Sequence, residues 1–130
     1  LNFPIKLIGI VDRIDLFNDT LRIIDYKTGM VQPKQLKLSD WNIFYEDDNY
    51  AYLFQILLYA WVQKPLLDRH PKATAGIISF RNLPQYFMPF SSNQGTDNAL
   101  RGQTFGHFER VLLEVISDIF NPELNFTEKK

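Results

Sequence analysis

The chain of 130 residues contains no cysteine. Disulfide bonds are therefore excluded, and an iron–sulfur cluster held by cysteines is not possible within this chain. No apolar run approaches the roughly 18–20 residues that a membrane-spanning helix needs. The first four residues, LNFP, lack the positive charge with which a signal peptide begins. We therefore expect a protein of the cytoplasm, a reducing compartment, with no membrane partner.

An excess of positive charge is also lacking, since 14 lysines and arginines stand against 15 aspartates and glutamates. Proteins that bind nucleic acid usually carry a basic patch, because contacts with phosphate dominate their affinity. No stripe of basic residues is evident in this sequence. Binding to nucleic acid would therefore require positive charge from a bound metal ion or from a partner protein.

Apolar residues, in contrast, are abundant. They make up 45% of the chain, which contains 11 phenylalanines. This composition is typical of a globular protein rather than a disordered one. A length of 130 residues is sufficient for one domain with its own core. We predict a single domain over residues 1–130.

Two runs rich in β-branched residues, 5–16 and 21–28, are separated by a short polar turn and predict a β-hairpin. If residues 18–19 form a two-residue turn, Asp12 lies directly opposite Asp25. Side chains that face each other across two strands have Cβ atoms roughly 4.5–5.5 Å apart, and like charges at that separation destabilise a sheet. The hairpin therefore predicts a pair of carboxylates that needs a compensating cation.

Two cations are available to these carboxylates. Lys27 follows Asp25 by two residues, so strand alternation places both side chains on one face. Divalent metal ions prefer carboxylate oxygens as ligands. If the turn has three residues instead of two, Asp12 faces Tyr26, and the pair of carboxylates is lost.

The rest of the chain predicts two main helices and two further strands. The first helix carries Gln55 and Tyr59 four residues apart, hence on one face. Proline in the last strand restricts that strand to a sheet edge. The predicted ranges are a loop at 30–45, a helix at 50–63, strands at 73–80 and 86–90, a loop at 91–102 and a helix at 105–120. The fold class is α/β or α+β, with helices on a small mixed sheet.

Three blocks in fixed order carry a resemblance to a known family: Gly9 to Asp15, Asp25 to Gly29, and Gln55 to Tyr59. Their order and spacing resemble the PD-(D/E)xK nuclease superfamily and, within it, the RecB-type branch, nearest to the nuclease domain of AddB-like helicase–nuclease subunits. The resemblance implies a restriction-endonuclease-like core with a catalytic hairpin. It also implies metal-dependent, exonucleolytic cleavage of DNA in double-strand-break repair and recombination, with a helicase motor or partner subunit.

The same resemblance implies that Asp12, Asp25 and the backbone carbonyl of Tyr26 bind Mg²⁺ or Mn²⁺. Family members usually have a further metal-binding His or Glu on an upstream helix, whereas this chain begins at Leu1, eight residues before Gly9. Many members also bind an iron–sulfur cluster through cysteines, which are lacking here. From these two absences we expect a fragment of a longer protein.

The catalytic residues implied by the resemblance are, besides the two aspartates, Lys27, Gln55 and Tyr59. Lys27 would position or activate the attacking water, while the other two would support the site and touch the DNA backbone. The residues alone leave alternatives open. Lys27 would also serve as simple charge compensation in a non-catalytic module that binds DNA or a partner. Gln55 and Tyr59 would also fit the core of an aromatic-rich helix.

Two further charged positions belong to the first block. Asp15 faces Arg22 in the same register, on the sheet face opposite Asp12, and predicts a cross-strand ion pair. Arg13 would either reach a phosphate or cover the sheet, and the sequence does not decide between them.

Overall fold

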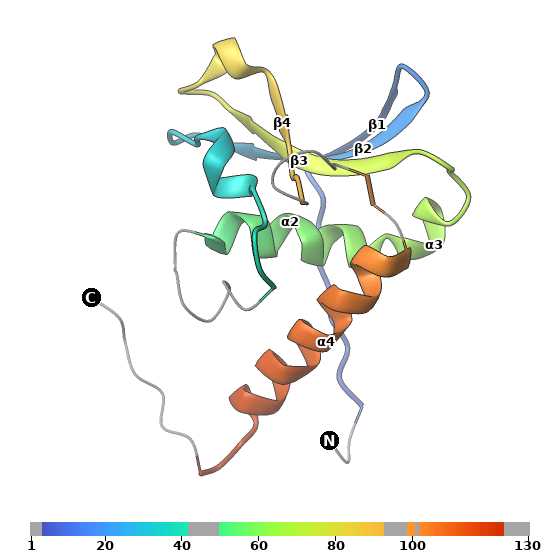
Figure 1. Cartoon of the computed structure of the whole chain (residues 1–130), viewed down its shortest axis with the longest axis vertical. Coiled ribbons are helices and arrows are strands. Elements are labelled where there is room, and N and C mark those ends of the chain that lie inside the picture. The colour runs from blue at the N-terminus through green and yellow to red at the C-terminus, as the bar shows by residue number, and fades with distance from the viewer. Residues whose placement is uncertain (1–3, 42–49, 93–98, 101, 124–130) are drawn as a thin grey trace.

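The computed structural model describes residues 4–41, 50–92, 99–100 and 102–123 (Figure 1). Regular elements of both kinds alternate along the chain. In order they are β1 (Arg13–Phe17), β2 (Thr20–Lys27), the 3-10 helix η1 (Pro33–Leu36), α2 (Ala51–Val62), α3 (Lys64–Leu67), β3 (Ala73–Ser79), the 3-10 helix η3 (Leu83–Gln85), β4 (Phe87–Pro89) and α4 (Gly102–Ile119).

The four strands form one mixed sheet in the order β1-β2-β3-β4. The β2–β3 pair is parallel, and its crossover includes α2, whereas the two outer pairs are antiparallel. Figure 1 shows α2 and α4 on the same side of this sheet. In the described part of the chain, the sheet therefore has one face covered by helices and one open face. This architecture confirms the predicted α+β class with a small mixed sheet.

The β1–β2 hairpin has the predicted two-residue turn. Asn18 and Asp19 both have positive φ, 48° and 68°, as the type I′ turn that connects two adjacent strands requires. Pairing runs from Arg13 opposite Ile24 to Phe17 opposite Thr20. The predicted register is therefore confirmed, and the three-residue turn is not formed.

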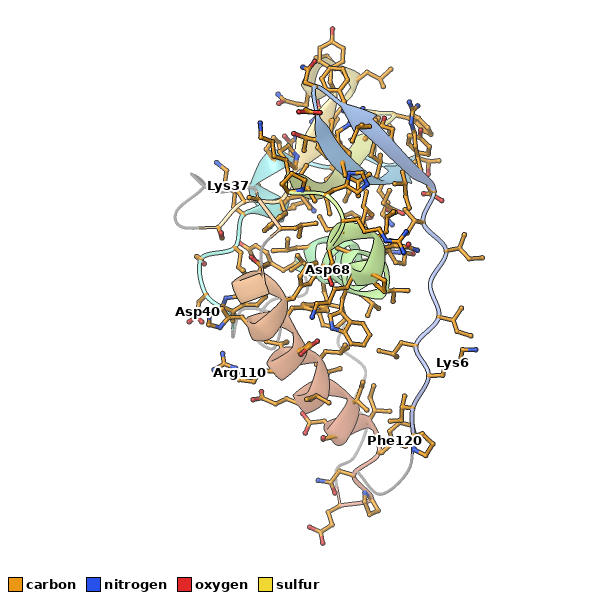
Figure 2. All side chains as sticks on the ribbon, turned by 90° about the vertical axis from the view of Figure 1, so that its right-hand side faces the viewer. Lys6, Lys37, Asp40, Asp68, Arg110 and Phe120 are labelled. Atoms are coloured by element: carbon orange, nitrogen blue, oxygen red, sulfur yellow. The ribbon has the colours of Figure 1, made fainter. Side chains whose placement is uncertain are left out.

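The first strand is shorter than predicted, because pairing begins at Arg13 instead of residue 5. Continued pairing would place Val11 opposite Tyr26. Instead, the Asp12 carboxylate accepts the Tyr26 N–H at 2.9 Å, so a side chain ends the ladder. Residues 4–11 have no regular secondary structure. Figure 2 shows this segment running beside the helices, with Lys6 projecting away from them.

The core lies between the covered face of the sheet and the helices. The buried residues of α2 recur at helical spacing, as a helix with one face on the core requires: Leu53, Ile56, Leu57 and Ala60. The α4 side of the core includes Phe105, Phe108, Leu112 and Ile116. No helix in the described ranges is long and apolar enough to cross a membrane.

Other boundaries also differ from the predictions. Helix α2 ends at Val62, one residue before the predicted end, and a short helix α3 follows, with Pro65 in its first turn, where the missing N–H is not needed. The predicted loop at 30–45 contains η1, and Trp41 packs against the core. Helix α4 begins at Gly102, three residues before the predicted start. The acidic residues 46–48 and most of the 91–102 loop lie outside the described residues.

Candidate active site

Strand β2 positions Asp25 and Lys27 on the covered face of the sheet, at the C-terminal end of the strand. The Asp25 side chain is only 6% exposed. Burial raises the pKa of Asp25, Lys27 partly opposes this shift, and Asp12 adds to it. The environment thus disfavours the ionised form of Asp25 unless more positive charge is present.

Lys27 is held from three sides. Its Nζ lies 2.9 Å from Asp25 Oδ2 and donates a hydrogen bond of 2.7 Å to Gln55 Oε1 on α2. The ammonium also lies 4.8 Å from the centroid of the Tyr52 ring, within the range of a cation–π interaction. Asp25 and Lys27 belong to the second sequence block and Gln55 to the third. The Lys27–Gln55 contact therefore joins two blocks whose residues are 28 positions apart in the chain.

Gln55 connects Lys27 to the third block's tyrosine, since its Nε2 donates to the Tyr59 hydroxyl at 2.8 Å. The first block reaches the same ring through Gly9. A Cβ atom at Gly9 would meet the Tyr59 ring at 3.1 and 3.2 Å, which is tighter than ordinary van der Waals contact. The glycine of the first block therefore allows the N-terminal segment to pass close to Tyr59.

Asp12 completes the convergence of the three blocks. It is exposed, and its hydrogen bond from the Tyr26 N–H holds the carboxylate at the end of β1. Tyr26 directly follows Asp25 in β2, so this hydrogen bond brings Asp12 close to Asp25, and Asp12 adds to the raised pKa of Asp25. The structure thus brings Asp12, Asp25, Lys27 and the backbone of Tyr26 together, while the role of the Tyr26 carbonyl as a ligand stays a prediction.

The chemistry of this donor set fits a divalent cation. Asp25 Oδ2 is buried and accepts no well-directed hydrogen bond from a described residue, although the Lys27 ammonium is nearby. Mg²⁺ is usually held by one or two carboxylates, with waters and substrate phosphates as the remaining ligands. Within the described ranges no group of three or more His, Cys, Asp or Glu side chains converges. Asp12 and Asp25 are therefore a two-carboxylate set of the kind that Mg²⁺ uses.

A buried serine that the sequence analysis did not single out anchors the loop after Lys27. Ser79 pairs with Lys27 in the parallel register. Its Oγ donates to the Gly29 carbonyl at 2.6 Å and accepts the Val31 N–H at 3.2 Å. Asn82 Nδ2 donates to the Val31 carbonyl at 2.8 Å. The sequence feature that could have indicated this role is a polar residue on the inward-facing side of an otherwise apolar strand.

The open face carries the predicted ion pair. Arg22 donates to both carboxylate oxygens of Asp15, each at 2.7 Å. Its guanidinium lies over the rings of Phe17 and Phe87, at 4.5 and 4.9 Å from their centroids. The hydrogen bonds from Arg22 lower the pKa of Asp15 below its usual range. The predicted ion pair is confirmed, and both of its side chains are largely buried.

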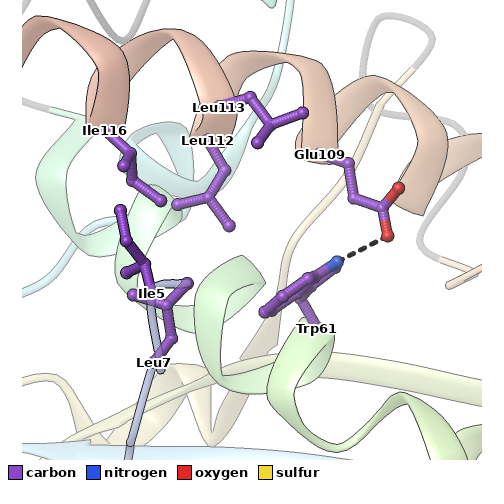
Figure 3. A pocket seen from close by; sticks show the side chains of 7 residues that line it. All are labelled: Ile5, Leu7, Trp61, Glu109, Leu112, Leu113 and Ile116. Atoms are coloured by element: carbon purple, nitrogen blue, oxygen red, sulfur yellow. Dashed lines mark hydrogen bonds between the residues drawn. The ribbon is translucent and has the colours of Figure 1, made fainter. Parts of the chain in front are cut away.

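A separate apolar pocket lies between the N-terminal segment and α4 (Figure 3). Ile5 and Leu7 point toward Leu112 and Ile116, and the Trp61 indole N–H donates to Glu109 Oε1 at 2.8 Å at one end. None of the three sequence blocks lines this pocket. It is a packing seam, distinct from the carboxylate site.

Comparison with known proteins agrees with the arrangement of the three blocks. A family model described as the PD-(D/E)XK nuclease superfamily matches residues 1–130. No curated protein and no solved structure gives a significant match. The mixed sheet, the helices and the convergence of Asp12, Asp25 and Lys27 agree with a restriction-endonuclease-like core. The chain belongs to the PD-(D/E)XK nuclease superfamily.

Proposed function

We propose that this protein is a metal-dependent deoxyribonuclease of the RecB-type branch, similar to the nuclease domain of AddB-like subunits. The observation that carries the proposal is the convergence of Asp12, Asp25 and Lys27 at one end of the hairpin. Superfamily membership supports nuclease chemistry, and the donor set supports Mg²⁺ or Mn²⁺ as the metal. Exonucleolytic action on linear DNA ends in repair and recombination is part of the proposal.

Each residue has a distinct task in this mechanism. Asp12 and Asp25 would hold the metal, which when bound would supply Lewis-acid polarisation of the phosphate and stabilisation of charge on the leaving oxygen. An ammonium group has three donors. Gln55 accepts a hydrogen bond from one of those of Lys27, and Asp25 lies within ion-pair distance of Nζ, so at least one donor remains to hold the attacking water or a phosphoryl oxygen. Gln55 and Tyr59 fix the position of Nζ, which limits the reorganisation that catalysis would require.

A partner is also part of the proposal. The chain has a net charge of −1, whereas DNA binding normally draws on many basic contacts. A helicase motor or other partner subunit in the cytoplasm would supply the positively charged channel and deliver the DNA end. The competing hypothesis is a non-catalytic module that binds DNA or a partner. It is favoured by the Lys27–Asp25 ion pair, which partly balances the site without metal.

The decisive experiment is Mn²⁺-dependent degradation of end-labelled linear DNA by wild type, Lys27→Ala and Lys6→Ala. Lys6 is an exposed lysine that projects away from the helices (Figure 2), so its variant is matched for charge. We expect wild type and Lys6→Ala to degrade DNA at the same rate. Lys27→Ala should reduce the rate at least about 100-fold, because a positioned proton-transfer or charge-stabilising group typically contributes about 10²-fold or more. Absence of cutting by wild type would favour the non-catalytic module, whereas equal cutting by wild type and Lys27→Ala would contradict the catalytic role of Lys27.

A further inference from the structure

Arg13 is a charged residue of the first block that the proposed mechanism does not use. It follows Asp12 directly, begins the edge strand β1, and its side chain is 54% exposed. Its Nε lies 3.1 Å from Asp15 Oδ2, yet Asp15 already receives two shorter hydrogen bonds from Arg22. The Asp15 ion pair therefore does not depend on Arg13.

The guanidinium of Arg13 has donor capacity to spare. A guanidinium carries five N–H donors. Nε faces Asp15, and Nη1 donates to the Tyr26 hydroxyl at 3.5 Å, a long hydrogen bond. Arg13 thus presents an exposed fork of donors, which is the geometry that binds phosphate oxygens in a bidentate manner.

Two aromatic rings extend this surface across the open face. The Tyr26 and Phe80 rings are stacked, with centroids 5.6 Å apart and planes 21° apart. Phe80 is 51% exposed, and Tyr26 lies between it and Arg13. Neither α2 nor α4 covers this face (Figure 1). The described residues therefore leave a stacked aromatic pair in contact with solvent beside the exposed guanidinium of Arg13.

This surface is continuous with the candidate metal site. Tyr26 stands between Asp25 and Lys27 in β2, and its N–H holds the Asp12 carboxylate. Arg13 and Asp12 are adjacent residues at the sheet edge, so their Cα atoms are about 3.8 Å apart. A polymer that passes the edge of β1 at this point would meet both faces of the hairpin.

We propose that Arg13, Tyr26 and Phe80 hold an unpaired segment of the DNA strand that is cut, an inference that rests on the proposed nuclease function. Arg13 binds a backbone phosphate close to the scissile one, and the Tyr26–Phe80 pair stacks on a base. Aromatic rings bind bases of any sequence through their faces, which are accessible only when the base is unstacked from a duplex. The surface thus selects single strands or frayed ends over intact duplex.

The test measures DNA affinity by fluorescence anisotropy, in an Asp25→Asn background with Mg²⁺ so that the strand stays intact. Labelled single-stranded and blunt duplex oligonucleotides are titrated over a range of salt concentrations. The variants added to this background are Arg13→Ala, Phe80→Leu and Phe80→Trp. Arg110→Ala is the charge-matched control, since Arg110 is exposed and projects from α4 away from the sheet (Figure 2).

We expect Phe80→Leu to weaken single-strand binding about fivefold or more, and Phe80→Trp to retain it. Duplex binding should change less than about twofold in both, because a duplex offers no free base to the ring. Arg13→Ala should weaken both forms and reduce the slope of log affinity against log salt by about 0.7–0.9. Arg110→Ala should match the background protein.

Several results would overturn the inference. Equal effects of Arg13→Ala and Arg110→Ala on DNA affinity would show that Arg13 makes no specific contact with phosphate. Retention of single-strand binding by Phe80→Leu would show that an apolar surface suffices, as expected if a protein segment docks there. A background protein that binds neither form of DNA would also overturn it. The proposed function stands apart from these results, because cutting by wild type is measured in the separate degradation assay.

Discussion

Replacing Lys27 by alanine should destabilise the protein through Asp25. The two charges lie 2.9 Å apart, where the attraction is about 6 kcal/mol at an effective dielectric constant of about 20. Most of this energy offsets the desolvation of both groups. Loss of one partner of a fully buried pair costs about 3–5 kcal/mol. Because the Lys27 side chain is 19% exposed, we expect a loss of about 2–3 kcal/mol at pH 7.

A double-mutant cycle isolates the charge contribution. In an Asp25→Asn background, Lys27→Ala removes only the hydrogen bond to Gln55 and the contact with Tyr52, which should cost about 1 kcal/mol. The assay is urea unfolding of the four proteins at pH 7, analysed by linear extrapolation. A coupling of about 1–2 kcal/mol is expected. Equal losses from Lys27→Ala in both backgrounds would refute the argument.

The pH dependence of Lys27→Ala gives a second check with a defined sign. The pKa of Asp25 is already raised in the folded state, so the folded protein holds the proton more tightly than the unfolded chain. Stability is therefore lost as pH rises from the unfolded pKa through the folded one. Removing Lys27 raises the folded pKa further. The stability gap between wild type and Lys27→Ala should consequently shrink as the pH is lowered toward the unfolded pKa.

Three further predictions concern other parts of the fold. Asp25→Asn should raise the melting temperature at pH 7, because it replaces a carboxylate whose burial raises its pKa, and should abolish stabilisation by Mn²⁺; an unchanged Mn²⁺ response would contradict the ligand assignment. Phe108→Ala should lose about 3–5 kcal/mol on urea unfolding, whereas Leu113→Ala, at a position 59% exposed, should stay within about 0.5 kcal/mol. The pKa of Asp15 is lowered by Arg22, so stability should fall as pH drops through the folded pKa of Asp15; an Arg22→Leu variant that unfolds in acid like wild type would contradict this.

The hairpin register was predictable from sequence, whereas the predicted cross-strand pair of Asp12 and Asp25 lies just beyond the ladder, which begins at Arg13. A two-residue turn with Asn and Asp at both positions needs positive φ, which these residues tolerate. Once the turn is set, every facing pair follows, including Asp15 with Arg22. The length of β1 was not predictable in this way, because β-branched residues before Asp12 favour an extended chain whether or not a partner strand is available.

The placement of Gln55 and Tyr59 beside Lys27 was predicted only through family resemblance. Residue patterns alone left Gln55 and Tyr59 equally suited to a helix core. Their contacts depend on where α2 crosses β2, which is decided by packing of the apolar helix face on the sheet. Ser79 was missed for a related reason, since a serine in an apolar strand gives no indication of which backbone groups it will meet.

The sequence by itself determined the hairpin, the shared face of Asp25 and Lys27, and the family to which the chain belongs. These features depend on backbone preferences and side-chain alternation, which act within a few residues of each other. Only the tertiary structure decided that Asp25 is buried, that α2 supplies the partner of Lys27, and that one sheet face stays open beside Arg13. Those features arise from packing between segments far apart in the chain, and burial then sets the charge balance of the site.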